Sequence, residues 1–139
     1  MADGTIGGGC NCGAIRYTLD SPPLAVAVCH CRNCQRQSGS AFSVNLVAKA
    51  RTMHVEGTLS LYEDPDTESG HPVQREFCGQ CGSPIRSIPT AMPSLIAVKA
   101  GTLDDPAAFA PTVQIWTCTA LPWSAIAGDL PRFERNQTA

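Results

Sequence analysis

Seven of the chain's eight cysteines lie in three tight clusters, and this clustering constrains the fold more than any other feature of the sequence. Thiolates supplied as short pairs from separate chain segments are typical ligands of a tetrahedral zinc ion, at about 2.3 Å from the metal. The pattern therefore predicts sites for a soft divalent metal, most simply zinc, that join distant parts of the chain. The clusters are Cys10-Asn-Cys12, Cys29-His-Cys31-Arg-Asn-Cys34 and Cys78-Gly-Gln-Cys81.

The spacing within each cluster indicates how it can bind an ion. In an extended segment residues i and i+2 point to the same face, so Cys29 and Cys31 can reach one ion together while His30 faces away. Cys10 and Cys12 have the same spacing. The form Cys-Gly-Gln-Cys-Gly at 78–82 is typical of a metal-binding knuckle, because glycine permits the tight backbone around the ion. We expect His30 to be a hydrogen-bonding structural residue.

Counting ligands leads to one closed site and one open site, because two four-sulfur sites need eight cysteines and the clusters supply seven. A closed site is structural, whereas three protein ligands with one exchangeable position are the arrangement of catalytic zinc. We expect a structural ion on Cys10, Cys12, Cys78 and Cys81, and a second ion on Cys29, Cys31 and Cys34. The alternative is a single ribbon-type site on Cys31, Cys34, Cys78 and Cys81.

Disulfide bonds are the main competing explanation for the cysteines. Residues 1–9 contain no apolar stretch of signal-peptide length, and no run approaches the roughly 20 apolar residues of a membrane span. We therefore expect a cytoplasmic, reducing location, in which clustered cysteines more often bind metal. The remaining cysteine, Cys118, lies in an apolar stretch and is expected to be a small buried hydrophobe.

Length and charge narrow the range of folds and partners. At 139 residues and 43% hydrophobic composition, the chain fits a single domain over residues 1–139. The ten lysines and arginines are scattered and the formal net charge is -2, so the sequence predicts neither a nucleic-acid partner nor a membrane partner.

Short runs with alternating apolar residues predict strands, and glycine and proline separate them. Regular strands with turn signals between them favour a mainly β sandwich or barrel-like fold. We expect no amphipathic helix of ordinary length, only one turn at 104–109, and a polar loop at 63–71. The predicted strands are 14–19, 24–28, 42–47, 74–77, 95–99 and 113–117.

Four stretches together resemble the glutathione-dependent formaldehyde-activating enzyme (GFA) family, also called the CENP-V family. They are GGCNCGAIRY at 8–17, CHCRNCQRQSGSAF at 29–42, REFCGQCGSPI at 75–85, and LPW at 121–123 followed by DLPRF at 129–133. The recognisable motifs span about residues 6–133. This resemblance implies a single zinc-stabilised, mainly β domain of the β-tent, or Mss4-like, type, with the same closed and open zinc sites as above.

The resemblance also implies an activity. It is that of a carbon–sulfur lyase of the S-(hydroxymethyl)glutathione synthase type, which joins glutathione and formaldehyde in a reversible reaction that also proceeds without enzyme. The implied partners are a small-molecule thiol, glutathione, and an aldehyde. The implied catalytic group is the open zinc site of Cys29, Cys31 and Cys34. Gln114 stands where many relatives carry a histidine.

Coordination to a metal deprotonates a thiol, so the open position could accept glutathione as a thiolate. The residues that follow the cysteine triplet are candidates for substrate contacts: an arginine can hold a carboxylate, and the others can orient ligands or donate hydrogen bonds to sulfur. These candidates are Gln35, Arg36, Ser38 and Ser40. For Trp116 and Trp123 we expect core packing, with walls of a pocket beside the open site as the alternative.

Two other functions stay open at this point. The same cysteines could form a non-catalytic module that binds glutathione, another small thiol or zinc itself. All metal could also be structural, in a protein-interaction domain. Two metal ions of different lability would disfavour the second of these, and catalysis of adduct formation distinguishes the enzyme from the module.

Overall fold

Two β-sheets form the framework of the protein in a computed structural model that describes residues 5–136. The first four and last three residues of the expected 1–139 domain lie outside the described part. The small sheet contains β1 (Ile6–Gly9), β2 (Arg16–Leu19) and β5 (Met53–Glu56). The large sheet contains β3 (Ala25–Cys29), β4 (Ser43–Lys49), β6 (Leu59–Asp64), β7 (Val73–Cys78), β8 (Pro84–Pro89), β9 (Leu95–Lys99) and β10 (Val113–Ile115).

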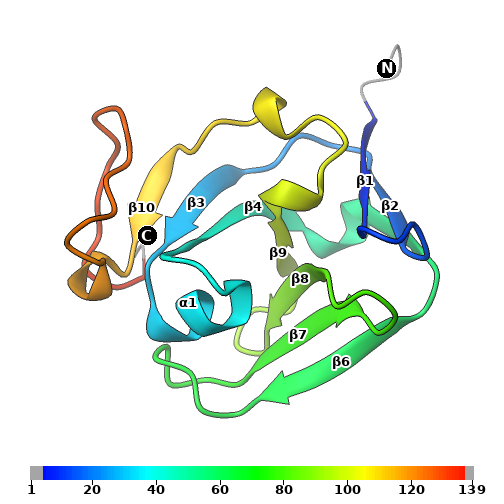
Figure 1. Cartoon of the computed structure of the whole chain (residues 1–139), viewed down its shortest axis with the longest axis horizontal. Coiled ribbons are helices and arrows are strands. Elements are labelled where there is room, and N and C mark those ends of the chain that lie inside the picture. Colours follow the sequence, from blue (N-terminus) through cyan, green and yellow to red (C-terminus); the bar gives the residue numbers. More distant parts are fainter. Residues whose placement is uncertain (1–4, 137–139) are drawn as a thin grey trace.

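The large sheet has the order β10-β3-β4-β9-β8-β7-β6, and the small sheet has the order β1-β2-β5. All pairings between these strands are antiparallel except that of β10 with β3, which is parallel. Figure 1 shows β10 and the small sheet at opposite sides of the molecule, with β3, β4 and β9 between them. The prediction of a mainly β fold is confirmed.

The core lies between the two sheets, because alternating side chains of both sheets point toward each other. On β2, Tyr17 and Leu19 are buried while the residues between and before them are exposed. They belong to one apolar cluster with Leu46 of β4 and Val98 of β9 from the large sheet. Cys29 of the second cysteine cluster lies on the opposite face of the large sheet, because its partner Ser43 is three residues from Leu46 on β4.

Leu46 supplies a test of this core. Its side chain is fully buried, so Leu46→Ala is expected to lower the free energy of unfolding by about 2–5 kcal/mol, through lost apolar burial and a residual cavity. Leu24→Ala is the matched control, because Leu24 is 60% exposed and its truncation should change stability by less than about 0.5 kcal/mol. Urea denaturation of metal-loaded protein measures both, and equal effects would contradict this arrangement of the core.

The sequence did not predict α1 (Arg32–Ser38), a short α-helix of seven residues. Its sequence is polar and shows no helical apolar periodicity, so the usual signal is missing. The helix is instead defined by its ends. The Cys31 sulfur accepts a hydrogen bond from the Cys34 backbone N–H at the start, and Gly39 adopts a left-handed conformation with φ 64° at the end.

Several strands were not predicted. The segment expected as a loop at 63–71 begins inside β6, whose exposed residues hide its alternation. Strand β1 is rich in glycine and therefore lacks the side chains that would predict a strand. Glycine is needed at position 8 because a Cβ there would collide with the Tyr17 side chain. β5 and β8 were also missed, whereas the turn expected at 104–109 is present as η3 (Pro106–Ala108).

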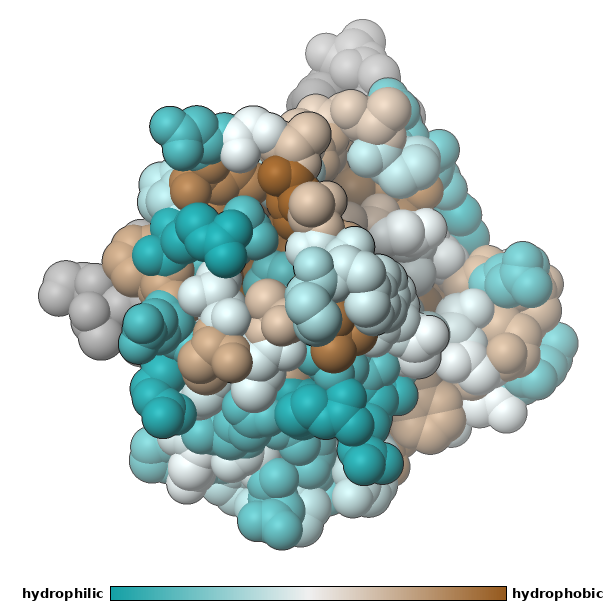
Figure 2. Space-filling view, turned by 60° about the vertical axis from the view of Figure 1, so that its left-hand side comes forward, coloured by the Kyte–Doolittle hydropathy of each residue, from teal (hydrophilic) through white to brown (hydrophobic). Residues whose placement is uncertain are grey.

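Figure 2 shows the side of the molecule on which β10 lies, turned toward the reader. Polar and apolar residues are interspersed on this face. Among residues 5–136, no helix is both long and apolar enough to cross a membrane.

Candidate metal centres

Four cysteines from two distant hairpins meet at one point. Cys10 and Cys12 lie in the turn between β1 and β2, and Cys78 and Cys81 lie at the end of β7 and in the turn that follows. Their sulfur atoms are all within 4.8 Å of one another. The group therefore joins the small sheet to the β7–β8 hairpin of the large sheet.

The two turns shape this four-cysteine group through backbone hydrogen bonds. The Ile15 N–H donates to the Cys10 sulfur at 3.2 Å, and the Gln80 N–H donates to the Cys78 sulfur at 3.4 Å. Gly82, with φ 82°, closes the second turn by donating its N–H to the Cys78 carbonyl at 2.8 Å. Hydrogen bonds of this kind orient sulfur ligands and stabilise their thiolate form.

The sulfur positions fit a tetrahedral metal. Four sulfurs about 2.3 Å from a central ion are separated from one another by about 3.8 Å. The Cys10 and Cys12 sulfurs are 3.6 Å apart and the Cys12 and Cys78 sulfurs 3.7 Å apart. A disulfide would require about 2.05 Å, and all eight cysteines are free. The group could hold a metal ion with its residues as placed.

The second group consists of Cys29, Cys31 and Cys34, whose sulfurs also lie within 4.8 Å of one another. Cys29 ends β3, Cys31 caps α1, and Cys34 lies in the first turn of α1. All three are buried, with 5–8% of each residue exposed. No fourth cysteine, histidine or carboxylate of residues 5–136 belongs to this group, so a tetrahedral ion here would keep one position for another ligand.

The three thiols differ in how readily they lose a proton. Hydrogen bonds with the Cys29 and Cys31 side chains lower the pKa of Cys34 to about 3, and the buried cations Lys99 and Arg75 act in the same direction. Hydrogen bonds with Cys31 and Cys34, together with burial, raise the pKa of Cys29. A metal ion would therefore displace a proton from Cys29.

The structure distinguishes the two groupings that the sequence left open. Cys31 and Cys34 lie in a different group from Cys78 and Cys81, so the ribbon-type site is not formed. Cys118 belongs to neither group. The expectation that Cys118 is buried is wrong, because it lies exposed in η4 (Thr117–Thr119), two residues after Trp116.

His30 lies on the face opposite Cys29 and Cys31, as the alternation along its segment predicts. Its Nε2 is 2.9 Å from the Gln114 Oε1, and both side chains are buried. Its ring also makes an edge contact with Phe42. Gln114 is thus the hydrogen-bond partner of His30 and does not join either cysteine group.

The four candidate substrate residues are placed in two ways. The Gln35 amide is buried and donates to the carbonyls of His30 and Thr119 at 2.9 and 3.0 Å, and the Ser38 hydroxyl donates to the Cys34 carbonyl at 2.7 Å. Gln35 therefore ties α1 to two neighbouring segments, whereas the Ser38 bond lies within the helix. Arg36 and Ser40, together with Gln35, line a cavity of about 530 Å³, whose other lining residues are Arg32, Gly39, Ala41, Leu121 and Trp123.

The two tryptophans have different surroundings. Trp116 is buried and packs against the three-cysteine group, which combines core packing with the role of a wall beside this group. It is the only residue other than glycine with a positive φ in the described chain, at 56°. Trp123 is 72% exposed, so the expectation of core packing is wrong for this residue.

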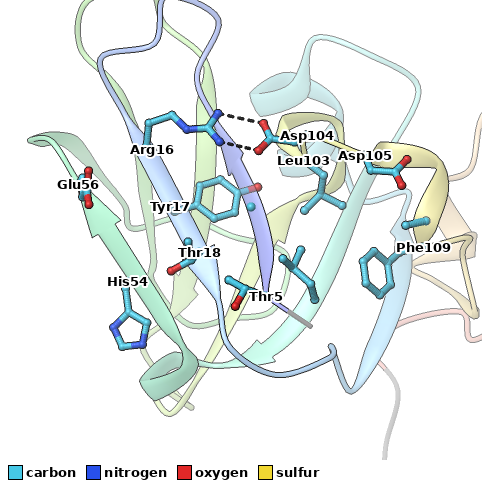
Figure 3. Close-up of a pocket in the computed structure, with 13 residues that line it drawn as sticks. Thr5, Arg16, Tyr17, Thr18, His54, Glu56, Leu103, Asp104, Asp105 and Phe109 are labelled. Atoms are coloured by element: carbon cyan, nitrogen blue, oxygen red, sulfur yellow. Dashed lines mark hydrogen bonds and ion pairs between the residues drawn. The ribbon is translucent and has the colours of Figure 1, made fainter. Parts of the chain in front are cut away.

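A larger cavity, of about 690 Å³, lies between the small sheet and the segment 103–109. Figure 3 shows Arg16 extending across it toward Asp104, with Phe109 at the other end. The Arg16 guanidinium donates two hydrogen bonds to the Asp104 carboxylate, at 2.9 and 2.5 Å. None of the residues that line this cavity is a cysteine.

Arg16 is expected to control the ionisation of Asp104. Hydrogen bonds from its guanidinium lower the pKa of this carboxyl group, so Arg16→Gln should raise the pKa toward about 3.9. Because the folded-state pKa is depressed, the pair stabilises the fold above the unfolded-state value, and this stabilisation is lost as the pH falls through the folded-state pKa. Carboxyl-carbon NMR measures the shift. Arg51→Gln, at another exposed arginine, should leave it unchanged.

Comparison with known proteins agrees with the cysteine pattern. The sequence profile of the family described as "Glutathione-dependent formaldehyde-activating enzyme" matches residues 5–119. A Halomonas elongata protein that is provisionally named a glutathione-dependent formaldehyde-activating enzyme is 31% identical over 101 residues. The alignment covers 70% of this chain and 64% of that protein, so the chain spans less than two thirds of the relative's length.

The fold also has a solved counterpart. The crystal structure of a Rhodobacter sphaeroides protein matches with a TM-score of 0.55, covering 70% of this chain and 87% of that one. At 22% sequence identity this likeness concerns the fold alone. Since the family profile extends over both cysteine groups, the chain belongs to the glutathione-dependent formaldehyde-activating enzyme family.

Proposed function

We propose that both cysteine groups bind zinc and that the three-cysteine group is the working site of a carbon–sulfur lyase. The reaction is the formation or cleavage of S-(hydroxymethyl)glutathione, or of a related adduct between an aldehyde and a thiol. The observation that carries this proposal is the convergence of three buried sulfurs without a fourth protein ligand among the described residues. Membership of the family supports the choice of substrates.

The donor set suits zinc, since thiolate ligands favour soft metals and a four-sulfur tetrahedral group is typical of structural zinc. Cys10, Cys12, Cys78 and Cys81 would hold the structural ion, and Cys29, Cys31 and Cys34 the second. When bound at the second group, zinc lowers the pKa of an incoming thiol, so that glutathione can enter as a thiolate.

The chain's own residues contribute position and exclusion of water. α1 and the end of β3 hold the three sulfurs together, and Trp116 covers them on one side. In adduct formation the thiol sulfur bonds to the aldehyde carbon, and the thiol proton ends on the former carbonyl oxygen. His30 cannot carry this proton at the sulfurs, because it lies on the other face and is bonded to Gln114.

For binding of the thiol we propose the cavity that Arg36 and Ser40 line. Arg36 is exposed there and can hold a carboxylate of glutathione. Gln35 acts indirectly, because its hydrogen bonds fix α1 and thereby the position of Cys34, and the Ser38 hydroxyl bonds to the Cys34 carbonyl within the helix.

Calorimetric titration of reduced glutathione into zinc-loaded protein tests the proposal. We expect saturable binding that Cys31→Ser abolishes, because this substitution removes one of the three sulfurs. Cys118→Ser is the matched control, since this cysteine is exposed and outside both groups, and it should leave binding unchanged. A wild-type protein that gives no heat and releases no zinc to a metal-sensitive dye would contradict thiol binding at this group.

The second candidate function is a non-catalytic module that binds glutathione, another small thiol or zinc. The burial of all three sulfurs favours the zinc-binding form of this module, because it restricts access of a thiol to the group. NMR exchange spectroscopy on glutathione and formaldehyde distinguishes the two functions, since adduct exchange already occurs without enzyme. Acceleration that depends on Cys31 supports the enzyme, whereas binding without acceleration supports the module.

A further inference from the structure

A buried lysine lies on the sheet face that carries the three-cysteine group. Lys99, the last residue of β9, is only 6% exposed. Its Nζ donates to the Ser43 hydroxyl at 3.0 Å, and this hydroxyl donates to the Asn45 Oδ1 at 3.0 Å. Lysine is almost never fully buried unless it is paired with an anion. The burial of the Lys99 ammonium therefore raises the question of which anion it is paired with.

The register of the large sheet places Lys99 beside the cysteines. Cys29 is directly opposite Ser43, and Asn45 is directly opposite Lys99. Ser43 and Asn45 are two residues apart on β4, so all four side chains share one face of the sheet. The ammonium is therefore hydrogen-bonded to the immediate cross-strand neighbour of a residue of the three-cysteine group.

The charges on this face do not balance without the cysteines. Arg75 is also buried there, but it is paired with Asp64 at 3.1 Å. Within residues 5–136, Lys99 has no ion pair with a carboxylate. A buried ammonium without an anion is costly. Burial accordingly lowers the pKa of Lys99, while Cys34 opposes this effect more than any other group.

A divalent ion with three thiolates carries one negative charge and with a fourth thiolate two, so a nearby ammonium stabilises the thiolate-bound form more than the form without it. We propose that Lys99 is the counter-cation of the three-cysteine metal group, and that it selects an anionic ligand, a thiolate, for the fourth position. This inference rests on the proposed binding of metal at that group. Lys99 thereby acts as a positioning residue: it stabilises the charge of the group and does not contact the reacting atoms.

The test uses Co²⁺, whose absorption bands report sulfur coordination, as the metal probe in the full-length protein. Lys99→Met should weaken Co²⁺ binding at the three-cysteine group by about 10–100-fold, the usual effect of removing a supporting partner of a metal ligand. The four-cysteine group should be unaffected, and a Cys34→Ser protein identifies which bands belong to each group. The chain has one other lysine, Lys49, which is exposed on β4, so Lys49→Met is the matched control.

Ligand selection supplies a readout that a purely structural role would not change. In the cobalt-loaded protein, Lys99→Met should weaken binding of 2-mercaptoethanol, which binds as a thiolate, and leave binding of the neutral ligand imidazole unchanged. Lys99→Arg keeps the charge and should restore both metal and thiolate binding. Ser43→Ala keeps the ammonium but removes its acceptor, and it should cause a smaller loss confined to the same group.

Three results would overturn the inference. The first is that Co²⁺ binds both Lys99→Met and Ser43→Ala as tightly as the wild type. The second is that Lys99→Met weakens Co²⁺ binding equally at both metal groups. The third is that Lys99→Arg fails to restore binding of Co²⁺ and thiolate. A wild-type protein that takes up only one Co²⁺ ion would instead contradict the second metal site itself, so this outcome separates failure of the proposed function from failure of the role of Lys99.

Discussion

Replacing Cys78 by serine is expected to lower the free energy of unfolding by more than about 4 kcal/mol, which few single substitutions do. Cys78 is almost fully buried, belongs to the apolar core and lies in the four-cysteine group. Structural zinc contributes about 10 kcal/mol or more in small zinc peptides, whereas whole domains are stable by about 5–15 kcal/mol. Losing a part of the metal's contribution therefore suffices to unfold much of the protein.

Chemical denaturation followed by circular dichroism, with stoichiometric zinc present, measures this effect. Cys118→Ser is the control, because its sulfur is exposed and belongs to neither group, and it should change stability by less than about 0.5 kcal/mol. A Cys78→Ser protein as stable as Cys118→Ser would mean that the four-cysteine group does not hold the two sheets together.

Replacing Cys34 by serine is expected to have the opposite pattern, with loss of one metal equivalent and of thiol binding but retention of the fold. The three-cysteine group spans residues 29–34, whereas Cys12 and Cys78 are 66 positions apart. A metal that closes the longer loop removes more conformational entropy from the unfolded chain, and the difference in free energy is about 2 kcal/mol when it is scaled with the logarithm of loop length. The serine should cost less than about 3 kcal/mol, mainly for a buried hydroxyl without a partner.

Metal analysis by mass spectrometry after gel filtration and thermal unfolding together test this second prediction. The Cys34→Ser protein is expected to carry one metal ion and to unfold cooperatively near the wild-type temperature. Titration with glutathione should release no heat of binding. If Cys34→Ser unfolds while Cys78→Ser remains folded, the structural and working roles of the two groups are reversed.

The helix α1 illustrates where sequence reasoning failed. Its residues are polar, and its two capping interactions depend on Cys31 and Gly39 rather than on an apolar stripe. The local sequence pattern could not predict α1, because a helix this short is stabilised by tertiary contacts. Segments of the loop after β6 pack on it: the Arg32 N–H donates to the Glu68 carboxylate at 2.8 Å, and Asn33 bonds to the same residue.

The edge strand β6 and the glycine-rich strand β1 were missed for related reasons. β6 lies at the edge of the large sheet and exposes Leu61 and Tyr62, so its burial does not follow the alternation that marks a half-buried strand. β1 needs glycine because Tyr17 lies against it. In both segments the residue types are set by the position of the strand relative to its neighbours, and that position is known only from the folded structure.

The sequence by itself determined that seven cysteines lie in three clusters with metal-ligand spacing and which way His30 points, whereas the tertiary structure decided how the clusters combine. Ligand spacing and the two-residue period of a strand are local properties, so they can be read without knowing the fold. Only the tertiary structure decided that Lys99 lies beside Cys29 through Ser43, that Gln114 is the partner of His30, and that Trp116 covers the three sulfurs. These contacts join β3 to β4, β9 and β10, and their register depends on packing across the whole sheet.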